Sequence, residues 1–117
     1  MKTLALIVTY ANRFIFLEQV ISSCIKENVD KILIVDNDSN QQSKEKLQAL
    51  VSKLYDKIDV IYLDKNVGSA GGFKVGLESA VGNYNCDFVW LLDDDNIPEE
   101  GSLQVLKKYW SSLSGNH

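Results

Sequence analysis

The sequence has few proline, cysteine and histidine residues. Its 117 residues include one proline, two cysteines and one histidine, the terminal His117. The longest apolar runs, residues 4–8 and 88–92, are far shorter than the roughly 20 residues that a transmembrane helix needs. Cys24 falls on the apolar side of an expected helix and Cys86 just before an expected strand, where free cysteines act as small hydrophobic residues. The sequence therefore predicts no transmembrane helix, disulfide framework or histidine metal site.

The chain also lacks an excess of basic residues. Its net charge is −4 and its pI is about 4.9, which argues against nucleic acid or an anionic membrane as a partner. An anionic ligand must therefore be held locally, by cations or backbone N–H groups. Lys2 precedes too short an apolar run for a signal peptide, so we expect a cytoplasmic protein. Any membrane association would reside in parts absent from this chain.

Short apolar runs alternate with segments of helical spacing along the whole chain. The runs, rich in β-branched or aromatic residues and therefore typical of strands, are residues 4–8, 31–35, 58–63 and 88–92. The helical segments are residues 17–25, 47–54, 70–81 and a fourth that begins near Pro98. That fourth helix carries on one face Leu103, Leu106, Trp110 and Leu113. The order predicts one α/β domain with a mainly parallel sheet and helices on both faces.

Polar residues gather where each expected strand ends. They are residues 9–13, 36–39, 64–72 and 93–95. Because the carboxyl ends of parallel strands meet at one edge of the sheet, where ligands bind, these four clusters are expected to lie along one edge. Helix N-termini and loop N–H groups converge at the same edge and favour phosphates. The pattern predicts a nucleotide site there.

Three consecutive carboxylates, Asp93, Asp94 and Asp95, directly follow the apolar run 88–92. Two carboxylates about 4 Å apart repel by roughly 1 kcal/mol in water and about 4 kcal/mol near a protein surface, and a divalent cation reverses that repulsion. Mg²⁺ and Mn²⁺ take oxygen ligands, and Mg²⁺ is usually held by one or two carboxylates and substrate phosphates. The alternative is a solvated acidic turn that leads into a helix, since Asn96 and Pro98 are typical of helix starts. The triplet alone leaves both interpretations open.

The glycines in residues 66–72 also have two interpretations. Glycine allows a backbone to approach either a ligand or a neighbouring strand. No Gly-Lys-Ser/Thr follows, so this segment is not a phosphate-binding P-loop. Close packing of the third helix on the sheet is favoured over ligand contact.

Asp36, Tyr10 and Arg13 each have more than one interpretation. Asp36 can accept a hydrogen bond from a base or a ribose hydroxyl, or it can cap a turn formed with residues 37–39. Tyr10 can stack on a base or be simply half-buried. Arg13 can pair with a phosphate, with Glu18 or with solvent.

Taken together, the four clusters resemble the family 2 glycosyltransferases, which have the nucleotide-sugar-binding GT-A fold. The matching stretches, in the family's order and spacing, are residues 7–13, 34–39, 66–73 and 90–98, which cover the chain almost end to end. The Gly71-Gly72-Phe73 form with three aspartates is most similar to the rhamnosyl- and galactofuranosyltransferase-like branch. The resemblance implies a Rossmann-like GT-A nucleotide-binding half whose four strands lie in the order 3-2-1-4.

The resemblance also implies roles for individual residues. In that family an Asp-x-Asp signature holds a divalent metal on the donor diphosphate, which makes Asp93 and Asp95 the expected ligands of Mn²⁺ or Mg²⁺. Asp94 would lie close to the ribose. The residues expected around the nucleobase are Thr9, Tyr10, Asp36 and Asn37. Ala11 is an insertion relative to the commoner Thr-Tyr-Asn-Arg form and alters the register after Tyr10.

The implied reaction transfers a glycosyl group from a nucleotide diphosphate sugar to a hydroxyl of a glycan or lipid-linked acceptor, with inversion, as in polysaccharide biosynthesis. It requires a carboxylate base for the acceptor's proton and a metal to neutralise the departing diphosphate. The family's base lies beyond the Asp-x-Asp strand, in a second half that this chain lacks. We therefore expect residues 1–117 to be the truncated donor-binding half of a longer enzyme, inactive when isolated. Strand 88–92 would be a bare apolar edge through which the chain forms a homo-oligomer.

Three other protein classes are alternatives to a glycosyltransferase. A sugar-phosphate nucleotidylyltransferase needs a glycine-rich loop with a basic residue after the first strand, whereas residues 9–13 contain no glycine. A phosphoacceptor receiver domain needs an acidic pair after its first strand, which this chain lacks. A non-catalytic nucleotide-binding or assembly module would share every motif and lack only turnover.

Overall fold

The computed structural model describes residues 1–114, so His117 lies outside the described residues. The elements in chain order are β1 (Thr3–Ala11), α1 (Phe14–Lys26), β2 (Lys31–Ser39), α2 (Gln41–Lys53), β3 (Ile58–Leu63), α3 (Gly68–Asn83), β4 (Phe88–Asp93) and α4 (Ser102–Ser114). The strands form one parallel sheet in the order β3-β2-β1-β4. Both the predicted α/β class and the predicted strand order are confirmed.

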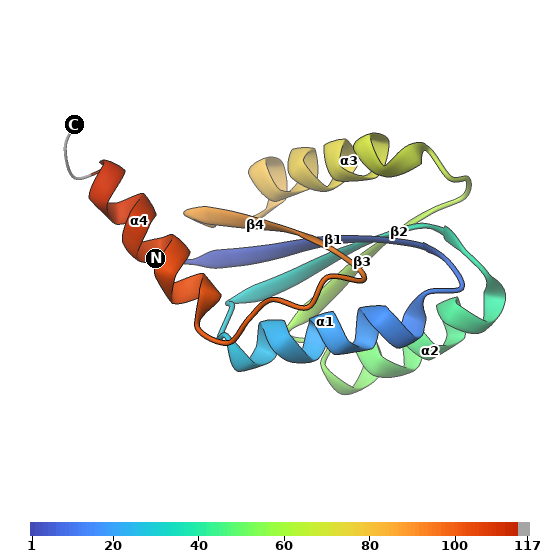
Figure 1. The fold of residues 1–117 in the computed structure, drawn as a ribbon. Helices are drawn as coiled ribbons and strands as arrows, with labels where there is room; N and C mark the ends of the chain where they lie inside the picture. The colour runs from blue at the N-terminus through green and yellow to red at the C-terminus, as the bar shows by residue number, and fades with distance from the viewer. Residues whose placement is uncertain (115–117) are drawn as a thin grey trace.

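Helices cover the two faces of the sheet unequally. Within residues 1–114, α1 and α2 pack on one face, and α3 alone packs on the other (Figure 1). The side chains of β1 alternate between the two cores, with Ala5 and Ile7 in the first and Leu4 and Leu6 in the second. All four are fully buried. A central strand with both faces covered explains why this run is continuously apolar rather than alternating.

Glycine brings α3 close to the sheet. A Cβ at Gly76 would lie 2.4 Å from Leu6 Cδ1, and a Cβ at Gly72 would lie 2.7 Å from Val8 Cγ1. Since real Cβ atoms do not approach so closely, the helix can sit at this distance only without side chains at these positions. The packing interpretation of the glycine segment is therefore confirmed at Gly72.

The first two strands are longer than predicted. β2 continues to Ser39, so residues 36–39 belong to the strand instead of following it. Asp36 pairs in register with Thr9 of β1 on one side and with Tyr62 of β3 on the other. Ladder bonds to two neighbours outweigh the local turn preference of these residues. The expected turn contact nevertheless exists, because the Ser39 N–H donates to Asp36 Oδ1 at 2.8 Å.

The fourth helix begins at Ser102, so the predicted start near Pro98 is wrong. Glu27, at the end of α1, sets the start: its carboxylate accepts the N–H groups of Gly101 at 3.1 Å and Leu103 at 3.0 Å. These hydrogen bonds lower the pKa of Glu27. The cap lies far away in sequence, and nothing in the local pattern at Pro98 indicates it.

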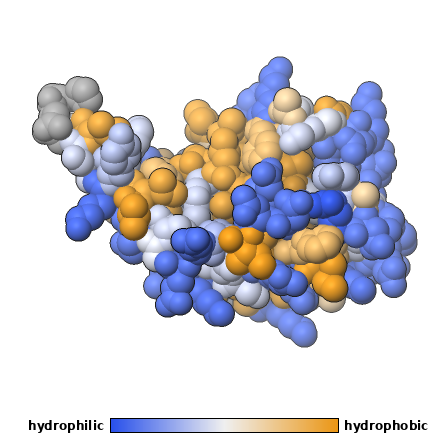
Figure 2. Space-filling view, viewed as in Figure 1, coloured by the Kyte–Doolittle hydropathy of each residue, from blue (hydrophilic) through white to orange (hydrophobic). Residues whose placement is uncertain are grey.

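Most of the predicted apolar face of α4 is not buried. Leu103 is fully buried, whereas Leu106, Trp110 and Leu113 are each more than one-third exposed. The helix projects away from the sheet (Figure 1), and apolar surface extends from α4 toward β4 (Figure 2). Trp110 meets Phe88 of β4 edge-to-face, with ring centroids 6.1 Å apart.

The structure also tests the expectations for the two cysteines and for a transmembrane helix. Cys24 and Cys86 are free thiols, and burial raises the pKa of Cys24 to about 12, which keeps it protonated and unreactive. Within residues 1–114, no helix has the length and apolar character needed to cross a bilayer.

Candidate functional site

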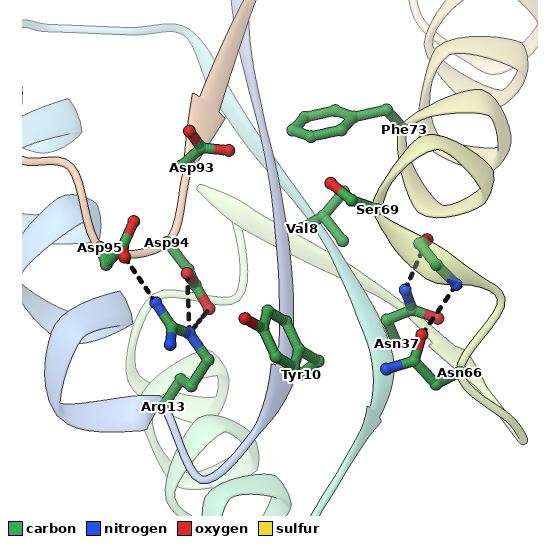
Figure 3. Close-up of a pocket in the computed structure, with 11 residues that line it drawn as sticks. Val8, Tyr10, Arg13, Asn37, Asn66, Ser69, Phe73, Asp93, Asp94 and Asp95 are labelled. Carbon is green, nitrogen blue, oxygen red and sulfur yellow. Dashed lines mark hydrogen bonds and ion pairs between the residues drawn. The ribbon is translucent and has the colours of Figure 1, made fainter.

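A pocket of about 310 Å³ opens at the carboxyl ends of β1, β2 and β4, beside the start of α3 (Figure 3). It is lined by Val8, Tyr10, Arg13, Asn37, Asn66, Gly68, Ser69, Phe73, Asp93, Asp94 and Asp95. Each of the four polar clusters predicted to share this edge contributes at least one lining residue. The volume is at the lower end of the range for small-molecule sites.

Asp94 is the buried member of the acidic triplet. Its Oδ2 accepts a hydrogen bond of 2.9 Å from the Thr9 hydroxyl. Arg13 Nε lies 3.0 Å from Asp94 Oδ1 and 2.9 Å from Oδ2. Burying a carboxylate is costly unless it is paired and hydrogen-bonded, and these contacts meet that requirement. Asp94 is therefore anchored to the end of β1.

Arg13 reaches two carboxylates at once. Its Nη2 lies 2.8 Å from Asp95 Oδ2, in addition to the contacts with Asp94. The guanidinium carbon also lies 4.9 Å from the centre of the Tyr10 ring and 5.5 Å from that of Phe16, both within cation–π range. Hydrogen bonding to Asp94 is the largest cause that raises the pKa of Arg13, so its charge is permanent. The sequence left a phosphate, Glu18 or solvent as the partner of Arg13. In the structure Arg13 pairs with Asp94 and Asp95, and not with Glu18.

Asp93 differs from its two neighbours. Its side chain is exposed, lines the pocket and makes no hydrogen bond or ion pair within residues 1–114. In Figure 3 the three aspartates and Arg13 lie on one side of the pocket, with Ser69 and Phe73 on the other. Within residues 1–114, Asp93 is thus unpaired, Asp95 pairs with Arg13 at the surface, and Asp94 is buried and paired.

The carboxylates that line the pocket supply only part of the ligand set of a hard cation such as Mg²⁺ or Mn²⁺. Among residues 1–114, no group of three or more His, Cys, Asp or Glu side chains forms a complete metal site. Two exposed carboxylates, on Asp93 and Asp95, nevertheless offer the oxygen donors that Mg²⁺ and Mn²⁺ prefer, and Mg²⁺ commonly takes its other ligands from phosphates and water. The set therefore suits a cation that arrives with a phosphate ligand.

The opposite wall of the pocket depends on Asn37. Its Nδ2 donates to the Gly68 carbonyl at 2.8 Å, and its Oδ1 accepts the Val67 N–H at 2.9 Å. Gly68 has φ +83°, a left-handed conformation that glycine adopts without strain. This clamp fixes the turn into α3, so that the helix N-terminus, with its positive dipole, faces the pocket.

The structure places the predicted site residues at different depths. Tyr10, Asn37 and the three aspartates line the pocket, whereas Thr9 and Asp36 do not. Thr9 contacts the pocket only indirectly, because its hydroxyl donates a hydrogen bond to Asp94. Asp36 is fully buried in β2, and its Oδ2 has no hydrogen-bond partner within residues 1–114.

Several lining residues were not among the predicted site residues. They are Val8, Arg13, Asn66, Gly68, Ser69 and Phe73. Arg13, Asn66, Gly68 and Ser69 lie in clusters whose position at the strand ends was predicted, so for these four the signal was their location. Val8 lies in the predicted first strand and Phe73 in the predicted third helix. Which side chains turn toward the pocket depends on tertiary contacts, such as the pairing of Arg13 with Asp94 and the position of α3 on the sheet.

Comparison with known proteins gives one family match. A sequence model described as glycosyl transferase family 2 matches residues 5–114. No curated protein matches the chain.

Several solved structures share the fold. S. aureus TarS 1–349 has a TM-score of 0.75 at 20% identity, over 96% of this chain and 33% of that chain. TarS 1–349 in complex with UDP has a TM-score of 0.75 at 21% identity, over 96% and 32%. GalNAc-T7 with UDP, GalNAc and Mn²⁺ has a TM-score of 0.68 at 19% identity, over 80% and 18%. These likenesses show the fold alone. The chain spans about a third of the length of TarS 1–349.

Proposed function

Because the chain belongs to glycosyl transferase family 2, we propose that it supplies the donor-binding half of a metal-dependent, inverting glycosyltransferase. The donor would be a nucleotide diphosphate sugar, and the acceptor a hydroxyl of a glycan or lipid-linked molecule. One observation carries the proposal: three aspartates at the end of β4 share a pocket with the N-terminus of α3.

The charge of this pocket supports a metal. Three carboxylates and one guanidinium line it, so its formal charge is negative and a bare diphosphate would be repelled. Asp93 and Asp95 would hold Mn²⁺ or Mg²⁺ between the protein and the diphosphate. The cation would neutralise negative charge on the departing diphosphate. GalNAc-T7 is a protein of similar fold in a structure with UDP, GalNAc and Mn²⁺.

The other walls suit the rest of the nucleotide. The N-terminus of α3 would face a phosphate, since its dipole and N–H groups favour an anion. Tyr10 is about two-fifths exposed and can stack on the base; Asn37 lines the same pocket, and Thr9 precedes Tyr10 in β1. The proposed contact of Asp36 with a base N–H would use its Oδ2, which has no partner within residues 1–114; because Asp36 is fully buried and does not line the pocket, its side chain would have to be uncovered when the base binds. Asp94 would lie close to the ribose.

A binding titration tests the metal bridge. UDP is titrated into the chain with Mn²⁺, with and without chelator, for wild type, Asp95→Asn and Asp38→Asn. Asp38 lies at the end of β2 outside the pocket and pairs with Lys44, so it is the matched loss of one carboxylate. We expect Asp95→Asn and chelator each to weaken binding about tenfold or more, and Asp38→Asn to change it less than twofold. Equal affinity for wild type and Asp95→Asn would contradict the metal bridge.

The catalytic base is proposed to lie outside residues 1–117. The chain would then bind a donor without transferring the sugar, which is also how a non-catalytic nucleotide-binding module behaves. A turnover assay with nucleotide sugars and simple acceptors should show no transfer by the isolated chain. Robust transfer would place the base within these residues.

Self-association through β4 is the last part of the proposal. β4 is an edge strand of the described sheet, and Leu91 on it is 49% exposed. Because a lysine on an edge strand opposes pairing with a second chain, Leu91→Lys should shift sedimentation toward the monomer. Val81→Lys is the control, since Val81 is 82% exposed on α3. A wild-type chain that sediments as a monomer at high concentration would refute this part.

A further inference from the structure

Arg13 is the only cation that lines the pocket within residues 1–114, and it lies where a metal would compete with it. It contacts Asp94 through Nε and Asp95 through Nη2 at 2.8 Å. The second contact uses a carboxylate that the proposed function assigns to the metal. A guanidinium and a divalent cation repel each other, so a cation bound at Asp95 Oδ2 would compete with Arg13 for that oxygen.

The two ion pairs of Arg13 differ in their surroundings. The Asp94 side chain is 5% exposed and also accepts a hydrogen bond from the Thr9 hydroxyl, whereas the Asp95 side chain is 53% exposed and, within residues 1–114, pairs with Arg13 alone. A buried pair with several hydrogen bonds is expensive to break, whereas an exposed pair contributes little. The Asp95 contact is therefore the exchangeable one.

Packing also limits how far Arg13 can follow Asp95. The guanidinium lies against the rings of Tyr10 and Phe16 while Nε bonds to Asp94. A guanidinium held from three sides would stay in place if Asp95 rotated toward a ligand in the pocket.

We propose that Arg13 is a positioning residue that serves as an internal counter-cation: it holds Asp95 at the rim of the pocket in the cation-free protein and releases it when a divalent cation binds. The inference rests on the proposed function, because it takes Asp95 as a metal ligand. Its consequence is that Arg13 lowers the affinity of the chain for the free metal ion. Asp94 remains paired with Arg13 in both states.

The test measures binding of Mn²⁺ alone, without nucleotide, from the electron paramagnetic resonance signal of the free ion. The key variant is Arg13→Lys, which keeps a positive charge beside Asp94, although a single ammonium does not reproduce the planar fork that spans two carboxylates. An exposed ion pair contributes up to about 1 kcal/mol, so freeing Asp95 should tighten Mn²⁺ binding by up to about fivefold. Arg13→Gln should tighten it at least as much, and if that variant fails to fold, Arg13→Lys decides the outcome.

Two controls separate this inference from a general charge effect. Lys44→Gln removes a cation that pairs with Asp38 at 3.3 Å outside the pocket, and it should leave Mn²⁺ affinity within twofold of wild type. In an Asp95→Asn background, Arg13→Lys should no longer tighten binding, because the carboxylate that it frees is absent.

The outcomes distinguish the two proposals. If wild type binds Mn²⁺ and Arg13→Lys binds it equally or more weakly, this inference is wrong and the proposed function stands. An equal gain in the Asp95→Asn background also overturns the inference, because the effect would not pass through Asp95. If neither the free ion nor Mn²⁺ with UDP binds to wild type, the metal-dependent function fails and the role of Arg13 fails with it.

Discussion

The close approach of α3 to the sheet predicts opposite effects for two alanine substitutions on one helix. In Gly76→Ala, the new Cβ would lie 2.4 Å from Leu6 Cδ1 and 3.1 Å from its Cγ. Leu6 is fully buried, so it cannot move aside into solvent. Overpacking a core costs about 1–3 kcal/mol, and the better helix propensity of alanine returns about 0.5–1 kcal/mol. We expect the free energy of unfolding to fall by about 1–2 kcal/mol.

Gly82→Ala is the matched control. A Cβ at Gly82 meets no heavy atom within 4 Å, so only the propensity gain remains and stability should rise by about 0.5 kcal/mol. Urea denaturation followed by circular dichroism measures both changes from the midpoint, provided that the slope is unchanged. A Gly76→Ala variant as stable as wild type would mean that the helix stands farther from the sheet, and the reasoning about the α3 wall of the pocket would fail with it.

Three further predictions address the Glu27 cap of α4, the Asn37 clamp at the start of α3 and the half-buried phenol of Tyr84. Glu27→Gln should lower stability by about 1–2 kcal/mol. Because the folded-state pKa of Glu27 lies below its ordinary 4.5, the contribution is present above that pH and is lost as the pH falls through the folded value, so acid denaturation curves of wild type and variant should converge. Asn37→Ala removes the partner of the Val67 N–H and of the Gly68 carbonyl at the start of α3, and it should lower the free energy of unfolding by about 1–3 kcal/mol in urea denaturation and speed proteolysis at this turn. Burial and the hydrogen bond to Asp59 raise the pKa of Tyr84 to about 12, so its stabilisation is complete below pH 10 and lost as the pH rises toward 12. Ultraviolet titration of phenolate in wild type and Tyr84→Phe checks this, and a Tyr84 that ionises near pH 10 would contradict it.

Placement of the candidate site at one edge of the sheet was predictable from sequence. Parallel strands end at the same edge, so the polar residues after each apolar run had to gather there. The side-chain partners were not predictable. Arg13 has an acidic neighbour five residues away in Glu18, yet it pairs with Asp94 and Asp95, which lie more than 80 residues away in sequence. Such a pairing exists only because β1 and β4 are neighbours in the sheet.

The sequence by itself determined the alternation of strands and helices, the parallel sheet, and the strand-end location of the polar residues, because hydrophobic periodicity and connection rules are local. Tertiary structure decided which of these residues face the pocket. Pairing on both sides drew Asp36 into β2, the distant carboxylate of Glu27 moved the start of α4 to Ser102, and glycine at position 76 set the distance of α3 from the sheet. Each of these depends on contacts between residues far apart in the chain, and their energies enter only when the elements pack.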